Sequence, residues 1–142
     1  MNNCELQAAF MAAKAAREHA YAPYSGFSVG AVLTDTEGQN FAGCNVENAS
    51  YGATICAERN AVTHAVAEGG SGEYTGLIVV SESQPPAPPC ALCLQVLAEF
   101  CRPEMKVYLA DMTGVKQTYR LEELLPHPFS RNSLTEHAQR KK

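Results

Sequence analysis

The sequence has 142 residues, which allows one compact domain and is too short for two domains with separate cores. Hydrophobic residues make up 46% of it and charged residues 18%, proportions that are typical of a globular protein and exclude a disordered chain. The formal net charge of -4 argues against nucleic acid as a partner, because such binding depends on clustered lysine and arginine. The cationic cluster at 140–142 is interpreted as a solvated end of the chain.

Hydropathy and cysteine content indicate where the protein works. No apolar stretch approaches the length of a membrane span, and the first residues lack a basic region followed by an apolar one. We therefore expect a cytoplasmic protein with no membrane partner, in which thiols stay reduced. Of the six cysteines, Cys4, Cys44 and Cys101 stand alone and are interpreted as small buried apolar residues. The other three have neighbours that suggest a chemical role.

Helices and strands are predicted to alternate along the chain. The first helix is predicted over residues 5–18, where Leu6, Ala9, Phe10 and Ala13 share one face. It is followed by strands at 27–34 and 40–46 around a turn at 35–38, a helix at 56–67, a strand at 75–81 that is buried on both faces, a helix at about 90–100, a strand at 105–110, a short strand at 118–120 and a helical turn at 121–125. This order predicts an α/β layered domain.

Two cysteine-containing fragments, at 54–59 and 89–93, fall at predicted helix starts. Cys90 and Cys93 are three residues apart, so both sulfurs project to one side of a first helical turn. The positive end of a helix lowers the pKa of a thiol and favours the thiolate that a metal needs. If the two helix starts meet, these sulfurs and that of Cys56 bind one zinc and leave a fourth position open, as in catalytic zinc sites.

An acidic residue accompanies the first of these cysteines. Glu58 lies two residues after Cys56, about 200° around an ideal helix. It is therefore poorly placed to share the metal and better placed to face a molecule bound beside it. A carboxylate in that place can accept a proton from water and return it to a substrate nitrogen.

A structural zinc site is the competing interpretation of the same cysteines. The Cys90–Cys93 pair alone favours it, with Cys56 and a histidine completing four ligands. None of the histidines, which are His19, His64, His127 and His137, forms a second paired ligand motif. A redox-active pair is disfavoured because it leaves Cys56 and Glu58 without a role.

Several segments together resemble a known enzyme family. They are 22–30, 43–51, 54–59, 89–93 and 123–126, which read APYSGFSVG, GCNVENASY, TICAER, PCALC and ELLP. The two cysteine fragments resemble the H-x-E…P-C-x-x-C motif of the zinc nucleoside deaminases in its three-cysteine variant. The full set resembles the small, homotetrameric cytidine deaminases. Cysteine in the first ligand position points to free nucleosides as substrates.

The resemblance implies a fold, a reaction and an assembly. The fold is a three-layer α-β-α domain with a central mixed sheet of about five strands. It spans 1–142 as a single catalytic domain, with a polar C-terminal tail from about residue 130. The reaction is zinc-dependent hydrolytic deamination of cytidine and deoxycytidine to uridine and deoxyuridine with release of ammonia, in pyrimidine salvage. The assembly is a homotetramer with one Zn²⁺ per chain and a small nucleoside as substrate.

The resemblance also implies roles for individual residues. Cys56, Cys90 and Cys93 bind zinc, and Glu58 is the proton shuttle. The other implied contacts are Phe27 beside the base, Asn45 and Glu47 on the ribose 3′ hydroxyl, the backbone of Ala57 on the polar edge of the pyrimidine, Tyr51 and Tyr24 at the pocket or a subunit boundary, and Phe129 over the base of a neighbouring subunit. Plainer alternatives are a core position for Phe27, an exposed polar strand face for Asn45 and Glu47, and an anchor for a loose tail for Phe129.

In the implied mechanism, zinc lowers the pKa of water, Glu58 takes the proton, and hydroxide attacks C4 of the ring. Glu58 then protonates N3 and assists the departure of ammonia. Three thiolates on a dication leave a net negative charge, which weakens the metal as a Lewis acid. Arg59 is placed to hydrogen-bond a thiolate and withdraw some of that charge, although a solvated arginine is the alternative.

The chain departs from the family pattern P-C-G-x-C-R-Q at two positions. Ala91 replaces the glycine and Leu94 the arginine, while Gln95 is kept. Two alternatives therefore stay open. One is a related deaminase for a modified or antibiotic aminopyrimidine nucleoside, such as the blasticidin S deaminases. The other is a structural-zinc protein with a decayed site.

Overall fold

The structure is a computed structural model that describes the backbone of residues 1–140 and the side chains of residues 1–135. The side chains of the cationic cluster at 140–142 lie outside the described residues. The elements in chain order are α1 (Asn3–Arg17), β1 (Gly30–Asp35), β2 (Asn40–Cys44), the 3₁₀ turn η1 (Tyr51–Ala53), α2 (Ala57–Ala67), β3 (Tyr74–Val80), α3 (Ala91–Phe100), β4 (Lys106–Asp111), β5 (Gly114–Arg120), α4 (Leu121–Leu124) and α5 (Arg131–Arg140). None of the described helices is long and apolar enough to cross a bilayer.

The strands form one mixed five-stranded sheet in the order β2-β1-β3-β4-β5. β1 is antiparallel to both β2 and β3, and β4 is antiparallel to β5. β3 and β4 are parallel, and the chain crosses between them through α3. A parallel pair needs such a crossover, which places α3 on a face of the sheet. The predicted mixed sheet of about five strands is confirmed.

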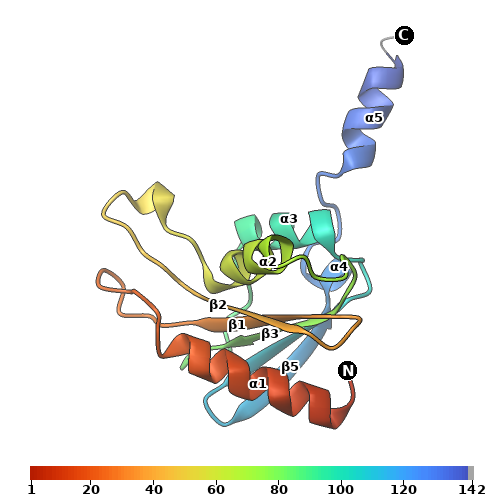
Figure 1. Cartoon of the computed structure of the whole chain (residues 1–142). Coiled ribbons are helices and arrows are strands. Elements are labelled where there is room, and N and C mark those ends of the chain that lie inside the picture. Colours follow the sequence, from red (N-terminus) through yellow and green to blue (C-terminus); the bar gives the residue numbers. More distant parts are fainter. Residues whose placement is uncertain (141–142) are drawn as a thin grey trace.

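Helices cover both faces of the sheet, with α1 on one side and α2 and α3 on the other (Figure 1). Successive residues of β3 divide between the two interfaces, as the two-residue period of a strand requires. Leu77 and Val79 pack in the core with α2 and α3, whereas Ile78 and Val80 pack in the core with α1. The predicted three-layer α-β-α arrangement is therefore confirmed.

Helix α2 lies directly on the β1–β2 hairpin at a glycine. A Cβ atom at Gly43 would lie 2.5 Å from both the Ala57 carbonyl oxygen and the Ala61 nitrogen. Any side chain there would push the two backbones apart, so glycine allows the close approach. This contact fixes the first turn of α2, where the first predicted metal ligand lies.

Three elements differ from the sequence-based prediction. β1 begins at Gly30 and not at residue 27, because the ladders with β2 and β3 start at Gly30 and the Asn45 side chain takes the Phe27 carbonyl and the Val29 N–H. β5 starts at Gly114, well before the predicted 118–120. It is a half-exposed edge strand rich in polar residues, so it lacks a clear apolar pattern. Helix α5 forms where only a polar tail was predicted, and it projects from the body of the molecule (Figure 1).

Candidate active site

The three cysteines predicted to bind zinc meet at the starts of two helices. Cys56 is the N-cap of α2 and Cys90 is the N-cap of α3, and neither side chain caps its own helix. Cys93 lies in the first turn of α3 and is buried. Because α2 and α3 lie side by side on one face of the sheet, their N-terminal ends bring the three sulfurs together (Figure 1).

The sulfur positions fit a tetrahedral zinc ion. The Sγ atoms all lie within 4.8 Å of one another, with 3.9 Å between Cys56 and Cys90 and 3.6 Å between Cys90 and Cys93. Zinc–sulfur bonds of about 2.3 Å in tetrahedral geometry require sulfurs about 3.8 Å apart. Among the described residues, no fourth histidine, cysteine or acidic side chain joins the group. The donor set therefore fits Zn²⁺ with one position open, and does not favour a closed structural site.

The surroundings of the sulfurs favour thiolate formation at Cys56. The pKa of its thiol is lowered to about 5, chiefly by a hydrogen bond from Cys93 and further by Arg59. The same hydrogen bond to Cys56, together with burial, raises the pKa of Cys93. Without a metal one negative charge is therefore held mainly at Cys56. Bringing all three sulfurs to thiolates needs a cation between them.

Arg59 lies against the cysteine group. Its Nη2 atom is 3.6 Å from the Sγ atom of Cys56 and donates to the carbonyl oxygen of Thr54 at 3.2 Å. Its Nε atom is buried and has no partner, the one such nitrogen or oxygen in the side chains that the structure describes. The hydrogen bond to Cys56 raises the pKa of the guanidinium. Arg59 is thus a cation beside the sulfurs and not a solvated surface residue.

Glu58 is an acidic residue buried beside the cysteines, with only 6% of its surface exposed. Burial raises the pKa of its carboxyl group to about 7, and the negative charge at Cys56 adds to the effect. An ordinary glutamate would be almost fully ionised at neutral pH. Glu58 instead stands near the midpoint of its titration, where a carboxyl group both accepts and donates protons.

A cavity of about 270 Å³ opens beside these residues. Its lining comes from three loops, two helix starts and the end of β3, and consists of Ser25, Phe27, Val29, Asn45, Glu47, Thr54, Cys56, Ala57, Glu58, Val79, Ser81, Ala87, Pro88 and Cys90. Four of the predicted substrate contacts (Phe27, Asn45, Glu47 and Ala57) therefore share one cavity with Glu58. The cavity lies past the carboxyl end of a parallel strand, where α/β sheets commonly bind ligands.

Asn45 and Glu47 have structural contacts as well as a place in the cavity wall. The Asn45 side chain accepts from the Val29 N–H at 2.9 Å and donates to the Phe27 carbonyl oxygen at 2.7 Å. An amide nitrogen has two hydrogens, so one remains for a ligand. The Glu47 carboxylate accepts from the backbone N–H groups of Tyr24 and Ser25 and from the Ser25 hydroxyl. The serine hydroxyl contributes most to the lowering of the Glu47 pKa.

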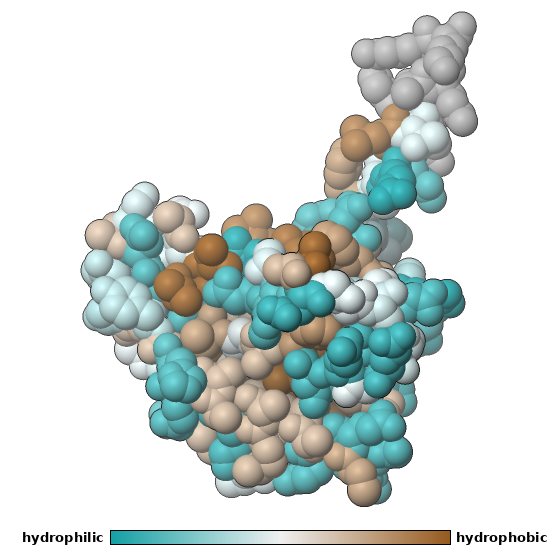
Figure 2. Space-filling view, viewed as in Figure 1, coloured by the Kyte–Doolittle hydropathy of each residue, from teal (hydrophilic) through white to brown (hydrophobic). Residues whose placement is uncertain are grey.

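The aromatic residues predicted at the site lie at or beyond its rim. Tyr24 and Tyr51 pack edge to face with ring centroids 6.0 Å apart and line an outer pocket of about 420 Å³. Phe129 is 62% exposed and does not line the cavity of its own chain. Gln95 donates to the Phe129 carbonyl oxygen at 2.6 Å and so ties this segment to α3. Figure 2 shows hydrophobic residues exposed on the surface beside the segment that carries η1.

The two departures from the family pattern have different surroundings. Leu94 is 7% exposed and belongs to the core cluster between the sheet and α2, which also contains Val62 and Leu97. Ala91 is the first residue of α3 and is exposed. Leu94 is therefore a packing residue in this chain, and Arg59 is the charged donor that lies against the cysteine sulfurs.

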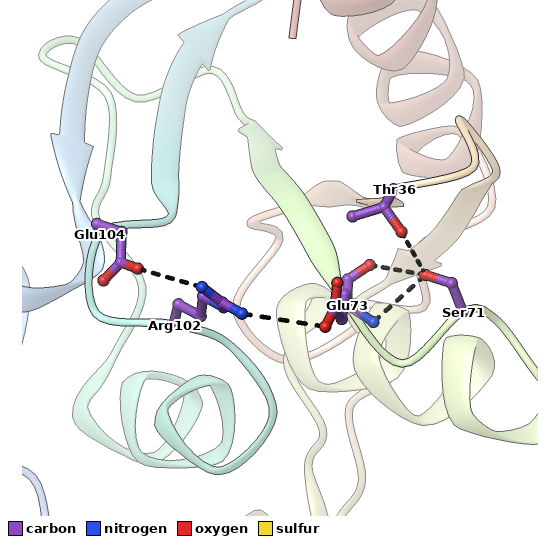
Figure 3. A network of polar contacts seen from close by, with 5 residues as sticks. All are labelled: Thr36, Ser71, Glu73, Arg102 and Glu104. Atoms are coloured by element: carbon purple, nitrogen blue, oxygen red, sulfur yellow. Dashed lines mark hydrogen bonds and ion pairs between the residues drawn. The ribbon is translucent and has the colours of Figure 1, made fainter.

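A second, larger cavity lies at the opposite ends of β3 and α3 and holds none of the predicted site residues. It measures about 680 Å³ and is bordered by Glu73, Tyr74 and the 99–103 segment. Figure 3 shows the polar network there, in which Arg102 pairs with Glu73 and Glu104 at 4.0 Å each. These are exposed ion pairs of the kind that contribute little to stability.

Some lining residues were not predicted from the sequence. Ser81 is only 2% exposed and directly follows β3, and Ser25 supplies the hydroxyl that binds Glu47. The position of Ser81 at the end of an apolar strand was an available signal, because such ends form ligand sites in α/β folds. Nothing in the local sequence indicates that Gln95 holds the Phe129 segment.

Fold and site together define an α/β domain with a three-cysteine group that fits zinc and a buried carboxyl group beside it. Residues 4–109 match the family model for the cytidine and deoxycytidylate deaminase zinc-binding region. The match covers most of the chain, so the protein belongs to this family.

Individual relatives agree with that assignment. The chain is 44% identical over 122 residues to a cytidine deaminase of Sporosarcina psychrophila, covering 86% of this chain and 89% of the relative. It is 45% identical over 121 residues to one from Halalkalibacterium halodurans, covering 85% and 91%. The crystal structure of cytidine deaminase from Burkholderia pseudomallei superimposes with a TM-score of 0.83 at 47% identity, over 91% of this chain and 100% of that one.

Proposed function

We propose that this protein catalyses the zinc-dependent hydrolytic deamination of cytidine and deoxycytidine to uridine and deoxyuridine, with release of ammonia. One observation carries the proposal: Cys56 and Cys90 of the three-cysteine group and the buried Glu58 carboxyl group line the same cavity. The named relatives are cytidine deaminases, and the match with this chain covers nearly their whole length. A role in pyrimidine salvage is part of the proposal.

The chemistry divides between the metal and Glu58. Cys56, Cys90 and Cys93 would hold a zinc ion, which would supply Lewis-acid chemistry for the activation of water. Glu58 accepts the proton that water loses and delivers it to N3 of the ring, which makes C4 more electrophilic. The water oxygen bonds to C4, and Glu58 passes the second proton of that oxygen to the 4-amino group, so that the C4–N bond breaks, ammonia leaves and a 4-oxo group remains. Arg59 donates to the Cys56 sulfur and offsets part of the thiolate charge.

The remaining residues of the cavity hold the nucleoside. Phe27 borders the base, and the backbone of Ala57 contacts the polar edge of the pyrimidine. Asn45 and Glu47 bind the ribose 3′ hydroxyl, for which one Asn45 N–H and the Glu47 carboxylate oxygens are the donor and acceptors. Tyr51, with Tyr24 beside it, lines the outer pocket, which adjoins the cavity on the ribose side of the proposed nucleoside. The position of four of these residues in one wall supports this arrangement.

We propose that the working unit is a homotetramer in which Phe129 covers the base in a neighbouring subunit. Phe129 is exposed and outside its own cavity, so its side chain is available to another chain. Large apolar side chains on nearby segments, including Val46, Ile55 and Leu92, are also exposed. Burying such residues between subunits is a common reason for their exposure on a single chain.

Two further parts of the proposal concern organisation and location. The chain works as one catalytic domain over 1–142, with the segment from about 130 as a polar extension. The protein acts in the cytoplasm, which agrees with six free cysteines and no disulfide among them.

The proposal is tested by offering the purified zinc protein cytidine, deoxycytidine and an antibiotic aminopyrimidine nucleoside in parallel, with product identified by chromatography. Cytidine and deoxycytidine are expected to give uridine and deoxyuridine. A Cys90→Ala variant is expected to lose zinc and turnover together. Turnover of the antibiotic nucleoside alone would replace the proposed substrate, and no turnover of any of them would favour a structural zinc site.

A further inference from the structure

The loop that carries Phe27 is held from two sides. From the cavity side, Asn45 binds the Phe27 carbonyl oxygen at 2.7 Å and the Val29 N–H at 2.9 Å. From the other side, the Nε atom of Arg17 donates to the carbonyl oxygen of Ser28 at 3.0 Å. Three consecutive residues, of which Phe27 and Val29 line the cavity, thus each accept a hydrogen bond from a side chain or donate one to it, and Val29 also accepts one from the Asn45 backbone N–H at 3.3 Å.

Arg17 also contacts a second loop that contributes residues to the cavity lining. Its Nη2 atom lies 3.1 Å from the Oε1 atom of Glu82. Glu82 directly follows Ser81, a buried lining residue, and it begins the loop that leads to the lining residues Ala87 and Pro88. One guanidinium group therefore joins two loops that both line the cavity and that adjoin the neighbouring strands β1 and β3 at the Gly30–Val80 pair.

The position of Arg17 is itself fixed by packing. It is the last residue of α1, which covers the face of the sheet opposite to α2 and α3 (Figure 1). A Cβ atom at Gly30 would lie 2.0 Å from the Ala13 carbonyl oxygen and 2.8 Å from the Arg17 nitrogen. Glycine thus lets the end of α1 rest on the start of β1, and the Arg17 side chain is only 13% exposed.

We infer that Arg17 is a positioning residue for nucleoside binding. By tying the Ser28 carbonyl to Glu82, it sets the distance between Phe27 and the 81–88 loop. This distance shapes the part of the cavity that is proposed to hold the base. An arginine suits this task because its planar group makes two directed contacts at once, which a lysine ammonium cannot do in the same geometry. The inference rests on the proposed nucleoside deaminase activity.

The matched experiment compares Arg17→Met with Lys14→Met on the zinc-loaded protein. Lys14 lies one turn earlier on α1, over the Phe10 ring, and none of the described ion pairs joins it to either loop. Arg17→Met is expected to raise the KM for cytidine by about 10-fold and change kcat by less than about 3-fold, since misplaced binding groups weaken substrate binding. Zinc is expected to stay at one per chain. Lys14→Met is expected to keep both constants.

Two further variants divide the contacts of Arg17. Glu82→Gln removes only the more exposed ion pair, because the Glu82 side chain is 73% exposed, and is expected to raise KM by about 2-fold. Arg17→Lys keeps the charge but loses the planar guanidinium group, and is expected to raise KM by about 3-fold. It takes the place of Arg17→Met as the test variant if Arg17→Met does not fold.

The outcomes separate this inference from the proposed function. A wild-type protein that turns over cytidine, with an unchanged KM in Arg17→Met and Arg17→Lys, would overturn the role of Arg17 alone. That role is also overturned if Arg17→Met and Lys14→Met change kcat and KM alike, as a general loss of stability would. A wild-type protein with no turnover would overturn the proposed function and this inference together.

Discussion

The Nη2 atom of Arg59 lies 3.6 Å from the Sγ atom of Cys56, and no arginine follows Cys93 to share that contact, because the next residue is the buried Leu94. We therefore propose that the Arg59 guanidinium offsets thiolate charge at this site. Arg59→Met is expected to lower kcat/KM by about 10–100-fold, as removal of partners of metal ligands typically does. The acidic limb of the pH–rate profile is expected to move to higher pH, because more electron-rich sulfurs make the metal a weaker acid.

The control for this substitution is zinc content. The loss of activity is attributed to charge only if zinc, measured by emission spectroscopy, stays at one per chain. An Arg59→Met protein with full zinc and an unmoved pH profile would show that the contact with Cys56 has no electronic effect.

The raised pKa of Glu58 predicts a pH-dependent stability in the metal-free protein. Below about pH 4.5 the carboxyl group is protonated in both folded and unfolded chains. Between its ordinary pKa of 4.5 and its folded pKa of about 7, the unfolded chain loses the proton first, so the free energy of unfolding falls as pH rises. The full cost, about 3 kcal/mol, is present above pH 7.

Glu58→Gln removes this cost, so the metal-free variant is expected to be more stable than the metal-free wild type at pH 8 and nearly equal to it at pH 4. Urea unfolding after chelation, at both pH values, measures the difference. Taking the difference between the two proteins cancels the titration of groups that do not interact with Glu58. Equal stabilities at pH 8 would mean that the Glu58 carboxyl group is solvated in the folded protein.

The close approach of α2 to β2 predicts a specific cost for one methyl group. In Gly43→Ala the new Cβ would lie 2.5 Å from backbone atoms of Ala57 and Ala61, which cannot rotate away. We expect a loss of about 1–3 kcal/mol in stability, typical of overpacking, together with lower activity because the start of α2 carries Cys56 and Glu58. Gly52→Ala is the matched control, since its Cβ would meet nothing within 4 Å. Thermal unfolding of both variants tests this, and equal melting temperatures would contradict it.

The proposed role of Phe129 in a neighbouring subunit predicts complementation between two impaired chains. Phe129→Ala alone is expected to raise the KM for cytidine, and Glu58→Gln alone to lose most turnover. In a mixed oligomer, some sites combine an intact Glu58 with the intact Phe129 of the other chain. Co-expressed and purified mixed oligomers are therefore expected to contain sites with the wild-type KM. Activity with only the KM of Phe129→Ala, or an active monomer in solution, would exclude a shared site.

Much of the fold was predictable from local patterns. The apolar run in β3 indicated a strand buried on both faces, and the cysteines at the starts of α2 and α3 indicated where two helices begin and meet. The edge strand β5 was underestimated because half of its residues face solvent and are polar. Helix α5 was missed because its sequence is strongly polar and offers few apolar residues for a buried face.

The reactive groups of the candidate site were predictable from the sequence, and the residues that position its loops were less so. Cysteine spacing and Glu58 pointed to the metal and the proton carrier without knowledge of the fold. The contacts of Arg17 with Ser28 and Glu82 join segments that are 11 and 65 residues away along the chain, and no local pattern reveals such a link. Residues that position a loop are found only when the packing of α1 against β1 is known.

Glu58, beside a three-cysteine zinc site, is proposed to move protons in the deamination of cytidine. The most direct test measures ammonia and uridine formed by the zinc-loaded wild type beside Glu58→Gln with the same zinc content. We predict equimolar uridine and ammonia from the wild type and a turnover lower by about 10²–10⁴-fold in the variant. A wild-type protein with one zinc per chain and no uridine, or a Glu58→Gln protein with near-normal turnover, would contradict this role.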